Sequence, residues 1–273
     1  MPARPKDVLV KGAVRTWHVI FILLVAYAVA EVSAFELTQR MDTPVRNALF
    51  PILNSTINAL ISLAFVVVVP EFRRSLRVVF SDPIVKPRAA DLAWAFLAMF
   101  CWGFGAYRAA FLAPLMQVEP EWYTLMGFHD TYVPLNPTYL AVAFGSVILA
   151  PIGEELMYRG FLMNLWISRW GMWGGVIASS IVFGLFHLQN ALFAGVMGFA
   201  FALVYLKYDS LLPGIAMHAA YNLLTFDPLM GRLEAVKNRA AIQDLTLWIP
   251  EMILAVLFFP AAWMFWRRFR PTR

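Results

Sequence analysis

The stretch YLAVAFGSVILAPIGEELMYRGFLMNLW, residues 139–166, decides how this chain folds. Most of it is apolar, and it exceeds the roughly 20 residues that a helix needs to cross the hydrocarbon of a bilayer. It nevertheless carries two adjacent carboxylates, Glu154 and Glu155, followed by Arg159. An ionised carboxylate at bilayer depth costs on the order of 3 kcal/mol or more unless it is paired. We therefore expect a membrane-spanning helix whose two glutamates serve a chemical purpose.

The composition of the whole chain indicates a membrane protein. Of its 273 residues 61% are hydrophobic and only 14% are charged, whereas about 25% are charged in an average soluble domain. The single cysteine, Cys101, excludes an internal disulfide framework and a zinc site built from several cysteines. The formal net charge of +5 could suggest a nucleic-acid partner. The basic residues, however, gather in short segments between apolar stretches, so we expect contact with a lipid bilayer and none with nucleic acid.

The lengths of the apolar stretches predict an all-α fold, a polytopic membrane helix bundle of about eight transmembrane helices. The fourth stretch is long enough to extend beyond the bilayer or to bend at Pro151 and Gly153. The expected spans are Trp17–Phe35, Ala48–Val69, Leu92–Leu112, Tyr139–Trp166, Trp173–Leu188, Leu192–Tyr208, Leu211–Phe226 and Leu247–Trp266.

Lysine and arginine in the connecting segments predict the orientation. With eight spans, three basic segments fall on one side, which the positive-inside rule makes cytoplasmic, so we expect both termini in the cytoplasm. The loop Ala113–Pro137 on the other side carries neither Lys nor Arg. The basic residues that carry this prediction are Arg4, Lys6, Lys11, Arg15, Arg73, Arg74, Arg77, Lys86, Arg88, Arg267, Arg268, Arg270 and Arg273.

The first span also has a feature of secretory leaders. Ala28-Val29-Ala30 follows a basic and then apolar start, and it is similar to a signal-peptidase site. The apolar run continues beyond this tripeptide, so an uncleaved first span is favoured.

Three pairs of side chains, each spaced four residues apart, stand out within the last five spans. They are Glu155 with Arg159, Phe183 with His187, and His218 with Asn222. Residues four apart share one face of a helix, so each pair can point toward the same place inside a bundle. The remaining two histidines, His18 and His129, lie at a span edge and in a loop, where ordinary interfacial positions explain them.

These residue types suit the hydrolysis of a carbonyl compound. A carboxylate beside a histidine can deprotonate a water molecule as a general base. A second histidine and an asparagine amide can donate hydrogen bonds to the oxyanion that forms during attack. Arg159 can keep a neighbouring carboxylate ionised and oriented. Ser179, Ser180 and Cys101 are better explained as packing residues than as nucleophiles.

Three other interpretations of the same residues stay open. Glu154, Glu155, His187 and His218 could supply nitrogen and oxygen ligands for a catalytic zinc ion. The polar pairs could instead hold helices together, at about 1 kcal/mol each. Buried glutamate and histidine also occur in transporters and proton relays, although the inverted repeats of many transporters are not visible here.

Three motifs together resemble a known family. Glu154-Glu155-Leu-Met-Tyr-Arg159, Phe183-Gly-Leu-Phe-His187 and His218-Ala-Ala-Tyr-Asn222 are similar to the motifs of the CAAX-protease and bacteriocin-processing (CPBP) intramembrane endopeptidases. Each motif alone is weak, but all three occur in order inside expected spans. The resemblance covers roughly Ala141–Phe226, and the rest of the chain matches only in being transmembrane.

The resemblance implies a glutamic-type intramembrane endopeptidase that needs no cofactor and acts on a membrane-associated protein or peptide. Glu154 and His187 would activate water, His218 and Asn222 would form the oxyanion hole, and Glu155, Arg159 and Phe183 would support the site. It also divides the chain into an N-terminal transmembrane region (1–135), a catalytic core (136–228), and an outer loop with the last span (229–273). Members tied to bacteriocin self-immunity leave a protective, non-enzymatic role open. A bacterial inner (plasma) membrane is the expected location, and the sequence specifies no oligomeric state.

Overall fold

The computed structural model describes residues 14–41, 43–70, 72–73, 76, 83, 85–114, 140, 143–225 and 245–271. These residues are almost entirely helical, and none of them lies in a β-strand. The predicted fold class, an all-α membrane helix bundle, is confirmed. His129 and most of the loop Ala113–Pro137 lie outside the described residues. So do the predicted domain boundaries near residues 135 and 228, and the division into three regions stays a prediction.

The helices follow the apolar stretches of the sequence. Several contain π-helical turns, in which the backbone hydrogen bonds span five residues instead of four. In chain order the main elements are α2 (Thr16–Thr38), α3 (Thr43–Val68), α5 (Ala89–Cys101) with π turns η1 (Trp102–Ala106) and η2 (Arg108–Leu112), η3 (Gly145–Leu149), α9 (Ala150–Glu155), η4 (Leu156–Met163), α10 (Asn164–Leu185), α11 (Ala191–Tyr208), α12 (Leu211–Thr225) and α14 (Ile249–Phe269). Two 3₁₀ turns, η5 (Leu188–Asn190) and η7 (Leu245–Trp248), precede α11 and α14.

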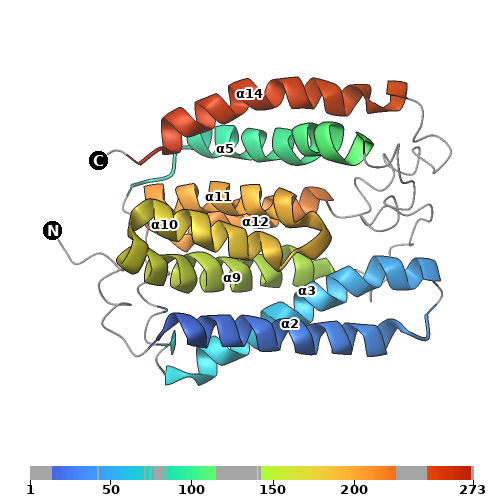
Figure 1. The fold of residues 1–273 in the computed structure, drawn as a ribbon, viewed down its shortest axis with the longest axis vertical. Coiled ribbons are helices and arrows are strands. Elements are labelled where there is room, and N and C mark those ends of the chain that lie inside the picture. The colour runs from blue at the N-terminus through green and yellow to red at the C-terminus, as the bar shows by residue number, and fades with distance from the viewer. Residues whose placement is uncertain are drawn as a thin grey trace.

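The helices form three groups in Figure 1, and the central group carries the three motifs. The pair α2 and α3 lies on one side, the pair α5 and α14 on the opposite side, and α9 to α12 lie between them. Gly153 of α9 faces α3 closely, since a Cβ atom there would come within 3.3 Å of Ala59. The two glutamates that follow it are therefore held in the middle of the bundle.

One glycine separates two of the expected spans. Within α10, Gly171 has φ 75° and ψ 173°, a conformation that L-residues with side chains rarely adopt. The helical path that begins at Gly145 therefore turns at Gly171, and the chain returns through the bundle toward His187 (Figure 1). This break falls between the fourth and fifth spans predicted from the sequence.

Four helical segments of the described chain are long and apolar enough to cross a membrane: Thr16–Thr38, Ala89–Leu112, Ala191–Tyr208 and Ile249–Phe269. Ile52–Val68 and Leu211–Leu224 are shorter apolar helices. The segments between Gly145 and Leu185, which hold Glu154, Glu155 and Arg159 of the first motif, do not meet the same criterion. The count of about eight spans therefore stays a prediction, although the described residues of every expected span are largely helical.

A charged cluster joins three helices at one end of the bundle. Asp91, in the first turn of α5, is buried and accepts hydrogen bonds from Lys207 Nζ at 2.6 Å and Arg268 Nη1 at 2.5 Å. Lys207 and Arg268 lie in the last turns of α11 and α14. Acidic groups are favourable at the start of a helix and basic groups at its end. The dipoles of the three helices therefore add to the stability that the ion pairs give this cluster.

Candidate active site

A buried ion pair forms the base of the site. Arg159 Nη1 donates to Glu155 Oε1 at 3.0 Å, and each side chain is only 1% exposed. Charges this deep are tolerated only when they are paired and hydrogen-bonded, so the pair explains how both residues persist inside an apolar bundle. Glu155 is the last residue of α9, and Arg159 lies one turn later in the π-helical segment η4.

The rest of the guanidinium is enclosed by α10 and α11. Arg159 Nη2 donates to the backbone carbonyl of Gly198 at 3.0 Å. The guanidinium carbon lies 4.3 Å from the centre of the Phe183 ring and 5.4 Å from that of Phe201, within the range of cation–π attraction. Phe183, the first residue of the second motif, therefore contacts Arg159 directly.

Glu154 is in a different environment from its neighbour. Its side chain is 24% exposed, and its Oε2 atom lies 3.7 Å from His218 Nε2 and 4.0 Å from His187 Nε2. Within the described residues, this oxygen accepts no hydrogen bond. Both separations are longer than a hydrogen bond, as is common for catalytic groups in unliganded enzymes. Glu154 thus presents a carboxylate oxygen to two imidazoles.

A backbone contact orients His187. Its Nδ1 atom lies 2.7 Å from the carbonyl oxygen of Phe183. A carbonyl can only accept, so Nδ1 carries the proton in this hydrogen bond. In the neutral imidazole, Nε2 then holds a lone pair and faces Glu154. The side chain is 34% exposed, compared with 24% for Glu154 and 8% for His218, so it is the most accessible of these three groups.

His218 links the two glutamates. Its Nδ1 atom lies 3.2 Å from Glu155 Oε1, while its Nε2 atom faces Glu154. Its ring stacks on Phe201, with the ring centres 4.6 Å apart and the planes 20° from parallel. Since Glu155 is paired with Arg159 and can only accept when ionised, Nδ1 of His218 is the donor in this contact.

Asn222 lies one turn after His218 on α12, at the edge of the same group. Its Nδ2 atom donates to the backbone carbonyl of Ser146 at 3.1 Å, which connects α12 to the π turn η3. This contact fixes the plane of the amide. The structure thus brings together six of the seven residues that the sequence analysis selected for this site: Glu154, Glu155, Arg159, Phe183, His187 and His218. The seventh, Asn222, lies one helical turn from His218 and contacts Ser146.

Comparison with known proteins supports the resemblance found in the sequence. Residues 136–224 match the family model described as "Type II CAAX prenyl endopeptidase Rce1-like". This match, here called the Rce1-like region, covers about a third of the chain. That region includes all three motifs, and the predicted resemblance to the CPBP family is confirmed at this level.

Two curated relatives also match. A Bacillus subtilis (strain 168) protein named "Putative membrane peptidase YdiL" is 30% identical over 115 residues, which cover 41% of this chain and 45% of that protein. An Escherichia coli protein named "Uncharacterized 24.3 kDa protein" is 36% identical over 55 residues, which cover 19% of this chain and 25% of that protein. The chain thus spans less than half the length of the curated relatives it matches. No solved structure matches the chain significantly.

Some residues of the Rce1-like region that shape the site were not selected from the sequence. Gly198 and Phe201 enclose Arg159 and His218, and Ser146 holds Asn222 through its backbone. Gly198 had a weak signal, because a glycine inside a helix often marks a close approach. Phe201 lies in a segment that is apolar on every side, and Ser146 acts through a backbone atom, so the sequence pattern distinguished neither.

The structure also describes Ser179, Ser180 and Cys101, which the sequence analysis assigned to packing. Ser179 and Ser180 both donate to the backbone carbonyl of Val176, at 3.1 and 2.7 Å, and Cys101 is buried and unbonded to sulfur. In the described part of the chain, no three His, Cys, Asp or Glu side chains are arranged to hold a metal ion.

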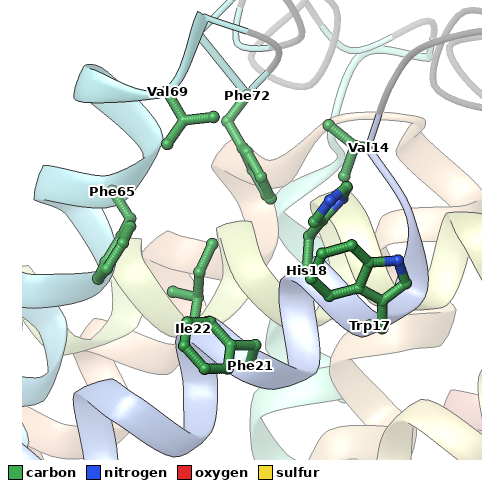
Figure 2. Close-up of a pocket in the computed structure, with 8 residues that line it drawn as sticks. All are labelled: Val14, Trp17, His18, Phe21, Ile22, Phe65, Val69 and Phe72. Carbon is green, nitrogen blue, oxygen red and sulfur yellow. The ribbon is translucent and has the colours of Figure 1, made fainter.

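A separate pocket lies at the start of α2. It is lined by Val14, Trp17, His18, Phe21, Ile22, Phe65, Val69 and Phe72 and has a volume of about 460 Å³ (Figure 2). His18 is the only titratable residue in this lining, and its Nδ1 accepts a hydrogen bond from the backbone N–H of Arg15 at 3.0 Å. No residue of the candidate site lines this pocket.

Proposed function

We propose that this protein is an intramembrane endopeptidase that hydrolyses a peptide bond of a membrane-associated protein or peptide. The observation that carries the proposal is the placement of one partly exposed carboxylate, Glu154, opposite the Nε2 atoms of His187 and His218. Beneath it, Glu155 and Arg159 form a fully buried ion pair. The family match of residues 136–224 and the name of the Bacillus subtilis relative point to the same class of reaction.

Glu154 and His187 would activate the attacking water. Both side chains are partly exposed, and the lone pair on His187 Nε2 faces the Glu154 carboxylate. A water held between them can pass a proton to one of the two groups as its oxygen bonds to the substrate carbonyl carbon. The same proton can then pass to the departing amine when the carbon–nitrogen bond breaks. One carboxylate and one imidazole therefore account for both proton transfers.

His218 and Asn222 would stabilise the oxyanion. The Asn222 amide is held by Ser146, and amide N–H groups are suitable donors to a developing negative charge. Because Nδ1 of His218 donates to Glu155, its Nε2 atom can donate only when the imidazole is doubly protonated. Glu155 would thus contribute through both Arg159 and His218.

Activity should depend on Glu154 and His187. Glu154→Gln and His187→Ala are each expected to lower peptide cleavage about 10³-fold or more, since each removes a proton-transfer group. Matched controls are Glu36→Gln and His18→Ala, which change the same residue types on α2, away from the site. Comparative proteomics of cell membranes with wild-type protein and with Glu154→Gln would reveal substrates through shifted termini. Full cleavage by either site variant, folded and inserted in the membrane, would contradict the proposal.

The proposed chemistry uses no metal ion. Activity is therefore expected to persist after thorough chelation, with the metal content of the same sample measured to confirm removal. Loss of cleavage on chelation and its return with zinc would instead favour a zinc-dependent peptidase. Cleavage by no form of the protein, together with proton or solute flux in vesicles that Glu154→Gln stops, would favour a transporter.

The proposed setting is the inner membrane of a bacterium, with both termini in the cytoplasm. In Figure 1, α2 begins and α14 ends on the same side of the bundle. Most of the described basic residues lie at that side, including Arg15, Lys86, Arg88, Lys207 and Arg268. Arg40, just after α2, Arg46 and Arg108 lie toward the opposite side of the bundle. The difference in positive charge between the two sides is therefore smaller than the loop Ala113–Pro137 alone suggested.

A further inference from the structure

We propose that Asn164 and Tyr205 are positioning residues that hold the π-helical backbone in the register at which Arg159 meets Glu155. The inference rests on the proposed function for its consequence in catalysis, but the arrangement itself can be tested without an enzyme assay. Neither residue belongs to the three motifs. Both are almost completely buried, at 0% and 1% exposure.

The side chain of Asn164 contacts the backbone of the arginine it would position. Its Nδ2 atom lies 2.9 Å from the carbonyl oxygen of Arg159 and 3.0 Å from that of Gly160. Reversing the amide would place its oxygen against two carbonyl oxygens, so these contacts require the nitrogen on this side. Asn164 thus satisfies backbone groups at the residue whose side chain forms the buried ion pair.

The π-helix explains why such a contact is needed. If the π pattern of η4 continued, the Arg159 carbonyl would accept the backbone N–H five residues later, which belongs to residue 164. That N–H points instead to the carbonyl of Phe161, where η4 ends and α10 begins. The side chain of Asn164 takes its place at Arg159. Buried backbone carbonyls are rarely left without a donor, and this contact stabilises the point where one helix type changes into the other.

Tyr205 fixes Asn164 from the neighbouring helix. Its hydroxyl oxygen lies 2.9 Å from Asn164 Nδ2. Tyr205 is seven residues after Gly198, whose carbonyl accepts from the Arg159 guanidinium, and residues seven apart share one face of a helix. One face of α11 therefore holds Arg159 twice: directly through Gly198, and through its backbone by way of Tyr205 and Asn164.

The consequence is a chain of contacts from α11 to the reacting group. Asn164 sets the Arg159 backbone, Arg159 holds Glu155, and Glu155 accepts from the histidine that faces Glu154. Loss of the first contact should let the arginine move away from Glu155. A buried glutamate without its cation favours the neutral, protonated form.

Dicyclohexylcarbodiimide, an apolar reagent that couples to protonated carboxyl groups, would report this change. In a Glu154→Gln background, Glu155 is expected to be protected, and Asn164→Ala should raise its labelling several-fold by peptide mass spectrometry. Tyr205→Phe should raise it less, and the two changes together should add little, because both act on one contact. Ser179→Ala, a matched buried polar change on α10 without a contact to Arg159, should leave it protected.

Labelling is measured only for protein that elutes as a folded species. If Asn164→Ala fails to fold, the milder Tyr205→Phe decides the matter. Unchanged labelling in the folded variants, or labelling of Glu155 already in the parent protein, would overturn the positioning role. The reagent reports the state of Glu155 and not peptide cleavage, so the two proposals can fail separately. If the labelling pattern is as expected but the parent protein cleaves no substrate, the proposed function is contradicted and the positioning role is retained.

Discussion

Two adjacent glutamates in this protein have opposite surroundings. Glu155 is fully buried, paired with Arg159 and contacted by His218, whereas Glu154 is partly exposed and faces two imidazoles across gaps of 3.7 and 4.0 Å. The difference follows from the helix, because neighbouring residues point about 100° apart around its axis. One carboxylate therefore serves to hold the site together, and the other is available for chemistry.

This difference predicts opposite effects on stability. Glu155→Gln would leave the Arg159 charge buried without a counter-charge and is expected to lower the free energy of unfolding by about 3–5 kcal/mol. Glu154→Gln removes a carboxylate whose Oε2 atom accepts no described hydrogen bond, so its stability should equal or exceed that of the parent. Thermal unfolding in detergent would compare the two. Equal destabilisation by both changes would contradict the assignment of separate roles.

The sequence could identify these residues but not their contacts. Spacing of four residues predicted which side chains share a helix face, and six of the seven selected residues lie together, with Asn222 one helical turn from His218. Spacing could not rank Glu154 against Glu155; the ranking came only from the family resemblance, and their burial now supports it. Asn164 and Tyr205 gave no signal, because a single polar residue within an apolar segment has no periodic pattern to mark it.

At the scale of helices, α11 is the scaffold against which the site is built. The sequence correctly predicted helical spans and the break between the fourth and fifth, where Gly171 lies. It did not predict the π turns around Glu155, because apolar periodicity identifies a helix without fixing the rotation of each residue. Nor did it show which face of α11 meets the site, since that helix is apolar all round and no polar stripe marks one side.

Close packing between α11 and Arg159 predicts sensitivity at Gly198. A Cβ atom there would lie 3.0 Å from Arg159 Nη2 and 3.1 Å from Phe183 Cδ1. Gly198→Ala is therefore expected to lower the free energy of unfolding by about 1–3 kcal/mol and to reduce activity. Thermal unfolding measures the first effect and cleavage the second.

Gly195, one turn earlier on α11, provides the matched control. The nearest atom to a Cβ there is Ser180 O at 3.6 Å, which is an ordinary contact. Gly195→Ala should be neutral or stabilising, because alanine is favoured over glycine inside a helix by about 1 kcal/mol. Equal losses in the two variants would mean that helix packing in general, and not the contact with Arg159, makes α11 sensitive.

For the whole molecule, the distribution of basic residues determines the expected orientation. The segments that end α11 and α14 and the one that begins α5 meet at one end, where Asp91 joins Lys207 and Arg268. These charges are stable at a membrane surface but costly within the hydrocarbon. This end of the bundle is therefore expected to mark the cytoplasmic face.

Reporter fusions would test the orientation. A fluorescent protein fused after Arg273 should be bright, because it matures in the cytoplasm of bacterial cells. Alkaline phosphatase at the same position should be inactive, and phosphatase inserted near residue 125 should be active, since that loop is predicted to lie outside. The reverse pattern would show that the inside-positive prediction is wrong for this chain, whose Arg40, Arg46 and Arg108 oppose it.

The hydrogen bond between His187 and Phe183 has a consequence for any attempt to redesign the protein. Every amino acid has a backbone carbonyl, so no exchange of the side chain at position 183 can delete the acceptor that orients this imidazole. An exchange such as Phe183→Leu would alter the surroundings of Arg159 and remove a ring contact with His187, whose ring centre lies 4.5 Å away, but it would keep this hydrogen-bond acceptor in place. The second motif therefore meets two separate requirements. The packing around Arg159 depends on which side chain stands at position 183, whereas the hydrogen bond to His187 depends only on the path of the backbone.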